Sequence, residues 1–430
     1  MDTKARALAP GVAVTTWKHR YTILAIILVT YLISYLDRMV MATAIPFIAA
    51  DLQLSPMAMG QTLSAFFAGY ALMQIPGGLL ADRFGPRLVL TASIALWSVM
   101  TAMTGMAAGL MAMLIIRVLF GVAEAPCPTA ISKAVSQWFP TRELSRTTGL
   151  LVGATAVGAS VAPIFVVALI ANWGWRAVFY SLFVPGVVLA LVVWRYVTNS
   201  PAESRHVTAQ ELADYDDERS MEHAPLKASL MQSLRTTAVL WCAASFFLVG
   251  MTNWGLLTWI PSYLLQARGF SAEKMGYFAS LINLAGAVGF SLGGYLCDKY
   301  FRHNMGLLIS IGAVLSGATT YFAATAASGE WAAVCFAAAL LTSGFAITPI
   351  LTLPLIVVPK HAVGGAFGIV NTAGQLAGLC SPLLIGYLLD LTGGNYRFVL
   401  YSLVACSLSA LLPILNIRYS PGGPDAKGKH

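Results

Sequence analysis

Long apolar runs, each bounded by charged residues, proline or glycine, recur along the whole chain. A helix needs about 20 apolar residues to cross the hydrocarbon core of a bilayer, and each run is at least about that long. The runs are continuous rather than alternating, which excludes a membrane β-barrel. The pattern predicts twelve transmembrane helices, near residues 21–47, 57–80, 88–109, 111–131, 147–171, 175–197, 238–266, 273–297, 304–325, 330–357, 364–390 and 394–416.

A long polar stretch between the sixth and seventh runs divides the chain into two halves. The predicted fold is an all-α membrane protein made of two pseudo-symmetric six-helix bundles. Its predicted parts are an N-terminal tail (1–20), a first bundle (21–197), a linker (198–237), a second bundle (238–416) and a C-terminal tail (417–430).

The composition and the charge distribution agree with this interpretation. Only 10% of the residues are charged and 58% are hydrophobic, whereas soluble domains carry about 25% charged residues. The net charge of +8 is explained by topology rather than by nucleic acid, because basic residues gather in the segments on one side. The positive-inside rule places that side, with both termini, in the cytoplasm of a cell inner membrane. The predicted outer segments contain only Arg176, Arg268, Lys274 and Arg397 of the 26 Lys and Arg residues.

Nothing in the sequence indicates an enzyme, a cofactor or a metal site. The six cysteines lie singly in or beside apolar runs, without a CxxC pair, which favours small buried side chains over disulfides or metal ligands. No nucleophile–base set or phosphate-binding loop is present.

Four charged side chains fall well inside predicted spans: Asp37 and Arg38 in the first, Arg117 and Glu124 in the fourth. A charge in hydrocarbon costs at least about 2.5–3.5 kcal/mol and usually marks a functional site. Arg117 and Glu124 are seven residues apart and therefore share one helical face. The structural alternative is that Asp37 and Arg117 form a static ion pair between the two spans.

The two halves repeat a motif at equivalent positions. GGLLADRFGPR (77–87) follows the second span and GGYLCDKYFRH (293–303) follows the eighth. Internal repeats of this kind build many transporters, with the substrate site at the midplane between halves that rock against each other. The sequence therefore predicts alternating access.

The first copy of the repeat resembles the GxxxDRxGxR signature of the major facilitator superfamily. The resemblance implies the major facilitator fold and a loop that latches the cytoplasmic side and controls conformational switching, with Asp298 in the weaker second copy. The alternative is that the arginines only orient the loop. The residues that carry the match are Gly78, Asp82, Arg83, Gly85 and Arg87.

Within that superfamily, YLDR in the first span and RVLFGVAEAPCP in the fourth are similar to the anion:cation symporter family, which includes bacterial proton-coupled sugar-acid and carboxylate carriers. WFPTRE (138–143) and TWIPSYL (258–264) strengthen the match. The resemblance implies that Arg38 contacts the substrate carboxylate and that Tyr70 faces the substrate. It also implies that Asp37 and Glu124 carry protons, while Arg117 pairs with them and modulates their proton affinity.

The chemistry of these residue types supports the same roles. A guanidinium binds a carboxylate bidentately, and a buried acid near a cation can exchange a proton near neutral pH. We expect Asp37 and Glu124 to load protons from outside, which frees Arg38 for the anion. The expected function is proton-coupled uptake of an organic anion, either a sugar acid, a dicarboxylate or an aromatic acid.

The second half offers only neutral candidates for the substrate site. Asn371 and Gln375 are four residues apart on one helical face, so both can reach a substrate. Trp259 and, in the first half, Tyr35 complete the candidate set. The alternative for the amides, including Asn283, is hydrogen bonding between helices. The run Ala125–Ala130 lacks the asparagine that often follows this acid in sugar-acid carriers, which favours a smaller, less polar or aromatic carboxylate.

Two other functions remain open at this stage. An anion exchanger or exporter of the same fold would use another driving solute, and a membrane solute sensor would bind without transport. The expected partners are the organic anion, protons and membrane lipid, with no nucleic acid. The family expectation for the oligomeric state is a monomer.

Overall fold

The computed structural model describes residues 18–205, 207, 226–359 and 362–416. Most of the two predicted tails and the middle of the predicted linker lie outside the described residues. The linker is not wholly irregular, because its end forms helix α7 (Leu226–Arg235), which packs against the second half of the chain. The division of the chain at the predicted domain boundaries stays a prediction.

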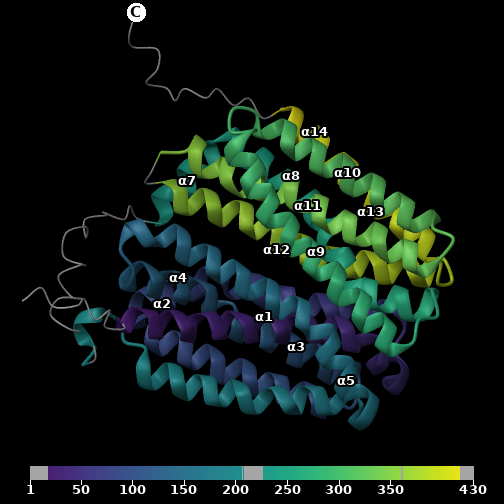
Figure 1. The fold of residues 1–430 in the computed structure, drawn as a ribbon, viewed down its shortest axis with the longest axis horizontal. Helices are drawn as coiled ribbons and strands as arrows, with labels where there is room; N and C mark the ends of the chain where they lie inside the picture. The colour runs from purple at the N-terminus through teal and green to yellow at the C-terminus, as the bar shows by residue number, and fades with distance from the viewer. Residues whose placement is uncertain (1–17, 206, 208–225, 360–361, 417–430) are drawn as a thin grey trace, which may run out of the picture.

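The described chain is helical and forms two layers (Figure 1). The first layer holds α1 (His19–Leu52), α2 (Pro56–Met106), α3 (Leu110–Glu124), α4 (Pro126–Trp138) and α5 (Thr141–Tyr196), followed by the short η1 (Pro201–Glu203). The second layer holds α7, α8 (Thr237–Ser262), η2 (Tyr263–Ala267), α9 (Ala272–Lys299), α10 (Met305–Thr325), α11 (Gly329–Val357), α12 (Val363–Leu391), α13 (Tyr396–Ser409) and α14 (Leu411–Leu415).

The described helices account for the twelve predicted spans. Ten helical stretches are long and apolar enough to cross a membrane. Two of these, α2 and α5, are each broken by a glycine with positive φ, Gly85 (79°) and Gly174 (75°). Only glycine adopts this backbone conformation at little cost, so each glycine lets the chain turn back and makes two spans of one helix. The predicted fold class, twelve spans in two bundles, is confirmed.

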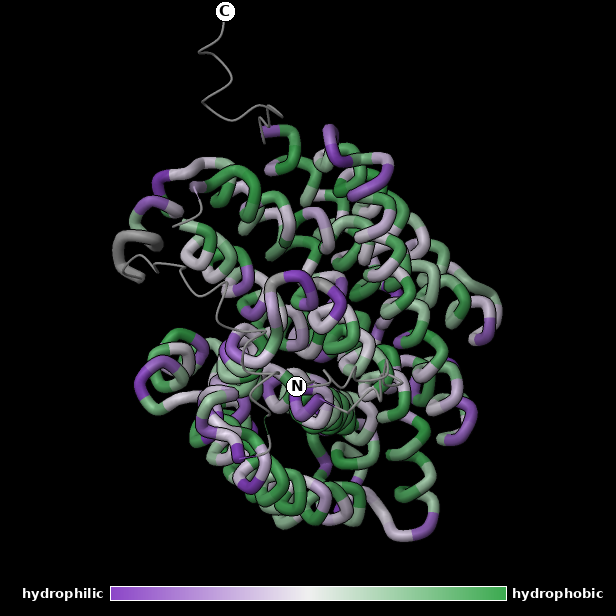
Figure 2. Tube along the Cα trace, turned by 60° about the vertical axis from the view of Figure 1, so that its left-hand side comes forward, coloured by the Kyte–Doolittle hydropathy of each residue, from purple (hydrophilic) through white to green (hydrophobic). Residues whose placement is uncertain are grey.

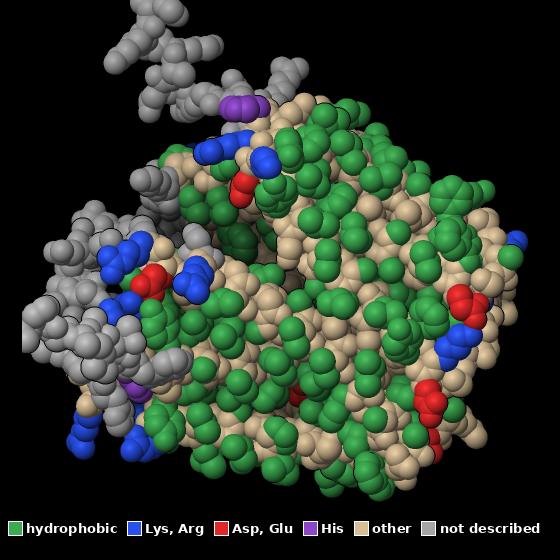
Figure 3. Space-filling model, in the orientation of Figure 1, with side chains coloured by type: hydrophobic (Ala, Val, Ile, Leu, Met, Phe, Trp, Pro, Cys, Tyr) green, Lys and Arg blue, Asp and Glu red, His purple; other side chains and the backbone are tan. Residues whose placement is uncertain are grey.

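Hydrophobic and charged side chains are distributed as a membrane protein requires. Hydrophobic residues follow the helices and hydrophilic ones concentrate at their ends (Figure 2). On the molecular surface, charged side chains gather at the two ends of the long axis, with an apolar zone between them (Figure 3). We call the end near Gly85 and α7 the linker end, and the end near Gly174 the far end.

The hydrophobic core shows that the two bundles are joined at one end only. At the far end a single cluster runs through both bundles and includes Ile45 and Leu63 of the first and Tyr263 and Ile385 of the second. Toward the linker end the core separates into one cluster for each bundle. The bundles therefore diverge from a common core at the far end.

The backbones of α2 and α12 approach each other closely at the far end. The backbone N–H of Met57, at the start of α2, donates to Asp390 Oδ2 at the end of α12, at 3.1 Å. A Cβ at Gly60 would lie 2.4 Å from the carbonyl oxygen of Pro382, and one at Gly386 would lie 2.6 Å from that of Pro56. These distances are too short for any side chain, so glycine is required at both positions.

At the linker end the interface helices have space around them. A Cβ added at Gly78 or Gly149 in the first bundle, or at Gly364 or Gly368 in the second, would meet nothing within 4 Å. Figure 3 shows the surface hollowed between the bundles toward this end. The structure is therefore closed at the far end and open at the linker end.

We predict that Gly386→Val prevents closure of the far end, because its side chain would overlap the backbone of Pro56. In a variant without native cysteines, a thiol at position 63, in the far-end core, should then react with a membrane-impermeant maleimide several-fold faster. Gly109→Ala is the control, since Gly109 has an extended backbone and no neighbour within 4 Å of an added Cβ. Equal labelling rates in the parent protein, Gly386→Val and Gly109→Ala would show that the contact between Gly386 and Pro56 does not hold the far end closed.

Candidate functional site

The structure brings the four charged side chains of the spans together, but not in the expected pairing. Arg38 Nη2 lies 3.0 Å from Glu124 Oε1, and these side chains are 5% and 1% exposed. Sequence analysis paired Arg117 with the acids and expected their protonation to free Arg38 for the anion. The structure differs in the pairing, because α1 and α3 place the guanidinium of Arg38, not that of Arg117, directly on Glu124.

Three aromatic rings surround the Arg38 guanidinium. The ring centroids of Tyr35, Phe66 and Tyr70 lie 4.9, 5.0 and 5.0 Å from its central carbon. Phe66 and Tyr70 are one turn apart on α2, so both face α1. Cation–π contacts of this kind stabilise a buried guanidinium without neutralising its charge.

Two glycines allow α2 and α3 to approach closely enough to build this site. A Cβ at Gly69 would lie 2.0 Å from the carbonyl oxygen of Val118, and one at Gly121 would lie 2.1 Å from that of Phe66. The reciprocal contact brings Phe66 over Arg117 as well, at 5.5 Å. One aromatic ring therefore separates the two arginines.

Arg117 makes no salt bridge within 4 Å among the described residues. It packs on Phe120 at 4.7 Å and on Phe66, and it interacts with Asp37 and Glu124 through longer-range electrostatics. The static Asp37–Arg117 ion pair, considered as an alternative from the sequence, is not formed. Arg117 instead contributes positive charge to both acids without direct contact.

Two hydroxyl groups bind the acids, and sequence analysis missed both. Ser34 Oγ donates to Glu124 Oε1 at 2.5 Å, and Thr101 Oγ1 donates to Asp37 Oδ2 at 2.6 Å. Ser34 could have been found, since it lies four residues before Arg38 on the same helical face. Thr101 lies in the second half of α2, and no sequence pattern pointed to it, because only the fold places that part of the helix beside α1.

The predicted polar residues of the second bundle are partly in contact with the first. Gln375 Oε1 and Trp259 Nε1 are buried and lack a hydrogen-bond partner among the described residues. Gln375 and the half-buried Asn371 lie on α12, which packs against α2, whereas Trp259 belongs to the far-end core. Asn283 donates to the carbonyl oxygen of Ala159 at 2.9 Å, so its amide joins α9 to α5, as the helix-packing alternative expected.

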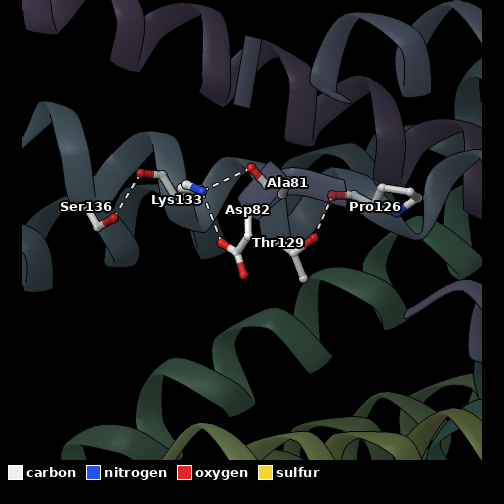
Figure 4. A network of polar contacts seen from close by, with 6 residues as sticks. All are labelled: Ala81, Asp82, Pro126, Thr129, Lys133 and Ser136. Atoms are coloured by element: carbon white, nitrogen blue, oxygen red, sulfur yellow. Dashed lines mark hydrogen bonds and ion pairs between the residues drawn. The ribbon is translucent and has the colours of Figure 1, made fainter. Parts of the chain in front are cut away.

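The residues of the GGLLADR repeat lie at the linker end. Lys133 of α4 donates to Asp82 Oδ1 and to the carbonyl oxygen of Ala81, each at 3.0 Å (Figure 4). In the first copy Asp82 is thus bound within its own bundle. In the second copy, Asp298 is exposed and has no hydrogen bond or salt bridge among the described residues.

The arginines of the repeat form no salt bridge among the described residues. Arg87 donates to the carbonyl oxygen of Trp194 at 2.8 and 3.0 Å and stacks on its ring. Arg83 is exposed and lies over the ring of Phe84. Gly85 makes the turn, and its backbone leaves no room for a side chain beside Asn199.

Within the described residues, no group of three or more His, Cys, Asp or Glu side chains is placed to hold a metal ion. What the structure does contain is a buried charge cluster in one bundle of a two-bundle membrane protein that is open at one end. This combination is the architecture of an alternating-access membrane transporter.

Comparison with known proteins gives the family. The model of the Major Facilitator Superfamily matches residues 27–382, and the chain belongs to this family of transporters, so it is not an enzyme. A bacterial homologue of the human lysosomal transporter Spinster, solved in an inward-facing unoccupied conformation, has the same fold, with a TM-score of 0.80 at 19% identity over 95% of this chain and 100% of that one.

Curated relatives match over nearly their whole length. A probable sulfoacetate transporter of Cupriavidus necator is 31% identical, over 95% of this chain and 97% of its own. The hexuronate transporter of Bacillus subtilis is 29% identical, over 95% and 98%. The D-galactonate transporter of Escherichia coli O6:H1 is 31% identical, over 97% and 99%.

The buried pair generates a prediction about stability. Removing one partner of a buried ion pair typically costs about 3–5 kcal/mol, while replacing both with apolar residues is often neutral. Glu124→Leu should therefore lower the thermal unfolding temperature of the purified protein strongly. The double variant Arg38→Met with Glu124→Leu should recover most of the loss.

The matched control is Glu330→Gln, which breaks an exposed pair with Lys274 and should cost at most about 1 kcal/mol. If the double variant unfolds as early as Glu124→Leu, Arg38 is not the group that Glu124 neutralises.

Proposed function

We propose that the protein is a proton-coupled symporter that takes up an organic anion. The observation that carries the proposal is the buried Arg38–Glu124 salt bridge, because a substrate anion and the Glu124 carboxylate would compete for the same guanidinium, so that protonation of Glu124 favours anion binding. Names of relatives that transport sulfoacetate, hexuronate and D-galactonate support an organic anion as the solute.

Arg38 is the proposed contact for the anionic group of the substrate. In the observed state Glu124 occupies the guanidinium, so a substrate carboxylate has to displace it. Protonation of Glu124 removes its negative charge and releases Arg38. An anion can then bind the guanidinium bidentately within the ring of Tyr35, Phe66 and Tyr70.

Asp37 is the proposed second proton carrier, and Arg117 the group that adjusts the proton affinity of both acids. Arg117 interacts with Asp37 and Glu124 without a direct bond. Its positive charge therefore favours release of protons from either acid once the substrate has left. Coupling then follows from the charge balance of four side chains rather than from a single proton site.

Transport by alternating access requires the open linker end to close when the far end opens. We take the linker end as cytoplasmic, since the basic segments lie there, so that the protein crosses a cell inner membrane with both termini inside. The observed structure is then inward-open. The proposed gating residues are Gly78, Asp82, Arg83, Gly85, Arg87 and Asp298, with Asp82 leaving Lys133 as the linker end closes.

A small or aromatic carboxylate fits the site better than a heavily hydroxylated acid. Beyond Glu124 the chain continues with Ala125, Pro126 and Cys127, and all three are buried. The Arg38 guanidinium is lined by rings rather than by amides. Asn371 and Gln375, with Trp259 deeper in the interface, are the proposed contacts in the second bundle.

The test of the function is uptake into proteoliposomes under an inward proton gradient, screened over hexonates, dicarboxylates, sulfonates and aromatic acids with internal pH recorded. One acid should accumulate and the interior should acidify with it. Binding and exchange without proton movement would favour the anion exchanger instead.

The test of coupling is Glu124→Gln, which cannot lose or gain a proton. Driven uptake should fall to background, while counterflow exchange of the same acid remains measurable because Arg38 is permanently released. Glu330→Gln, an exposed acid at the far end, should behave as wild type. Gradient-driven uptake by Glu124→Gln at the wild-type rate would remove Glu124 from the proton path.

A further inference from the structure

The Thr101 hydroxyl lies between two hydrogen-bond acceptors. Its Oγ1 is 2.6 Å from Asp37 Oδ2 and 3.0 Å from the carbonyl oxygen of Trp97, one turn earlier on α2. A hydroxyl has one hydrogen, so it can donate to only one of them at a time. Asp37 and Thr101 are 3% and 1% exposed, so both side chains are shielded from bulk water.

We propose that Thr101 is a positioning residue for the proton on Asp37, and that its hydroxyl hydrogen moves between Asp37 and the Trp97 carbonyl as Asp37 loses and gains that proton. This inference rests on the proposed function, since it assigns a device to one of the two proposed proton carriers. Thr101 itself never bears the proton.

When Asp37 is ionised, the hydroxyl donates to Oδ2. The distance of 2.6 Å is typical of an O–H donor on a charged oxygen. When a proton from the aqueous phase binds Oδ2, that oxygen becomes the donor and Thr101 Oγ1 the acceptor. The hydroxyl hydrogen then turns to the Trp97 carbonyl, so no donor is left without an acceptor and no bond between heavy atoms changes.

The alternative position for the proton is less favourable. Asp37 Oδ1 has no hydrogen-bond partner among the described residues. A proton there would be a buried O–H without an acceptor, which is costly. Oδ2 lies beside the Thr101 hydroxyl, which can donate either to Oδ2 or to the Trp97 carbonyl. Oδ2 is therefore the oxygen that keeps a hydrogen-bond partner in both protonation states.

Glu124 lacks this arrangement. Ser34 donates to Glu124 Oε1, but within the described chain its hydroxyl has no second acceptor. Arg38 donates to the same oxygen. Within the described residues, the hydroxyl that bonds Asp37 therefore has a second acceptor and the one that bonds Glu124 has none.

The charged groups that face Asp37 come from α3 and from its own helix. They are Arg117 and Glu124, with Arg38 next to it in sequence. Helix α8 has no charged residue. The charged residues of α2, α4 and α5 lie toward the ends of the molecule, around the Gly85 and Gly174 turns and the helix termini. Within the described structure, Thr101 is thus the one neutral side chain that forms a hydrogen bond with this carboxylate.

The chain offers a matched set of variants. Thr101→Val keeps the shape and removes the hydroxyl, and Thr101→Ser restores it. Thr104→Val is the control, because Thr104 is fully buried one turn along the same helix and donates only to a backbone carbonyl, that of Met100, at 2.9 Å.

The first readout is the pH dependence of driven uptake. Losing a hydrogen bond to the charged carboxylate costs more than losing one to the neutral acid. In Thr101→Val the pH of half-maximal uptake should therefore move by about one unit toward alkaline values. Thr101→Ser should return it to the wild-type value, and Thr104→Val should not move it. An unshifted Thr101→Val profile, or an equal shift in Thr104→Val, overturns the proposal.

The second readout does not depend on transport. Infrared difference spectra of the purified protein over pH report the carbonyl stretch of a protonated carboxyl group, and the band lost in Asp37→Asn belongs to Asp37. Its titration midpoint should shift in Thr101→Val as the uptake profile does. If wild type shows no proton-driven uptake but the band still shifts, the symport proposal fails and the role of Thr101 stands. An unshifted band refutes the role of Thr101 alone.

Discussion

The salt bridge between Arg38 and Glu124 is the interaction on which the rest of the structure depends. A guanidinium and a carboxylate that are almost wholly excluded from water are tolerated only when each satisfies the other. A change in the charge or binding state of one partner therefore changes the electrostatic energy of the other. In the proposed mechanism this links a proton on Glu124 to an anion on Arg38, and that link is what would couple the two fluxes.

Among the described residues, the groups around the salt bridge include aromatic rings and a second arginine, and none of them is another acid in contact with Arg38. Aromatic rings around Arg38 hold the guanidinium in place without cancelling its charge, whereas a second acid in contact would have neutralised it permanently. Arg117 packs on Phe66 and adds positive charge near the pair without bonding the carboxylate oxygen of Glu124 that Arg38 binds. The close contact of α2 with α3 at Gly69 and Gly121 makes this spacing possible, because a side chain at either glycine would push the helices apart.

Glycine also determines where the two bundles touch. At the far end Gly60 and Gly386 let α2 and α12 touch along their backbones, while Gly78 and Gly364 at the linker end of the same two helices face open space. The same pair of helices is therefore in close contact at the far end and separated at the linker end. The charge cluster lies in the first bundle beside α2.

The sequence by itself determined the class of fold and the membership of the charge cluster. Apolar runs of span length predict a helical membrane protein, and the four charges in those runs are expected to lie together inside the protein because hydrocarbon penalises an exposed charge. Only the tertiary structure decided the pairing. Arg38 rather than Arg117 bonds Glu124, Arg87 bonds a backbone carbonyl, and Thr101 reaches Asp37 from a distant part of the chain. Sequence spacing fixes which residues share a face of one helix, but contacts between helices depend on how closely and at what height the helices pack, and this is set by glycines and side-chain shapes along the whole interface.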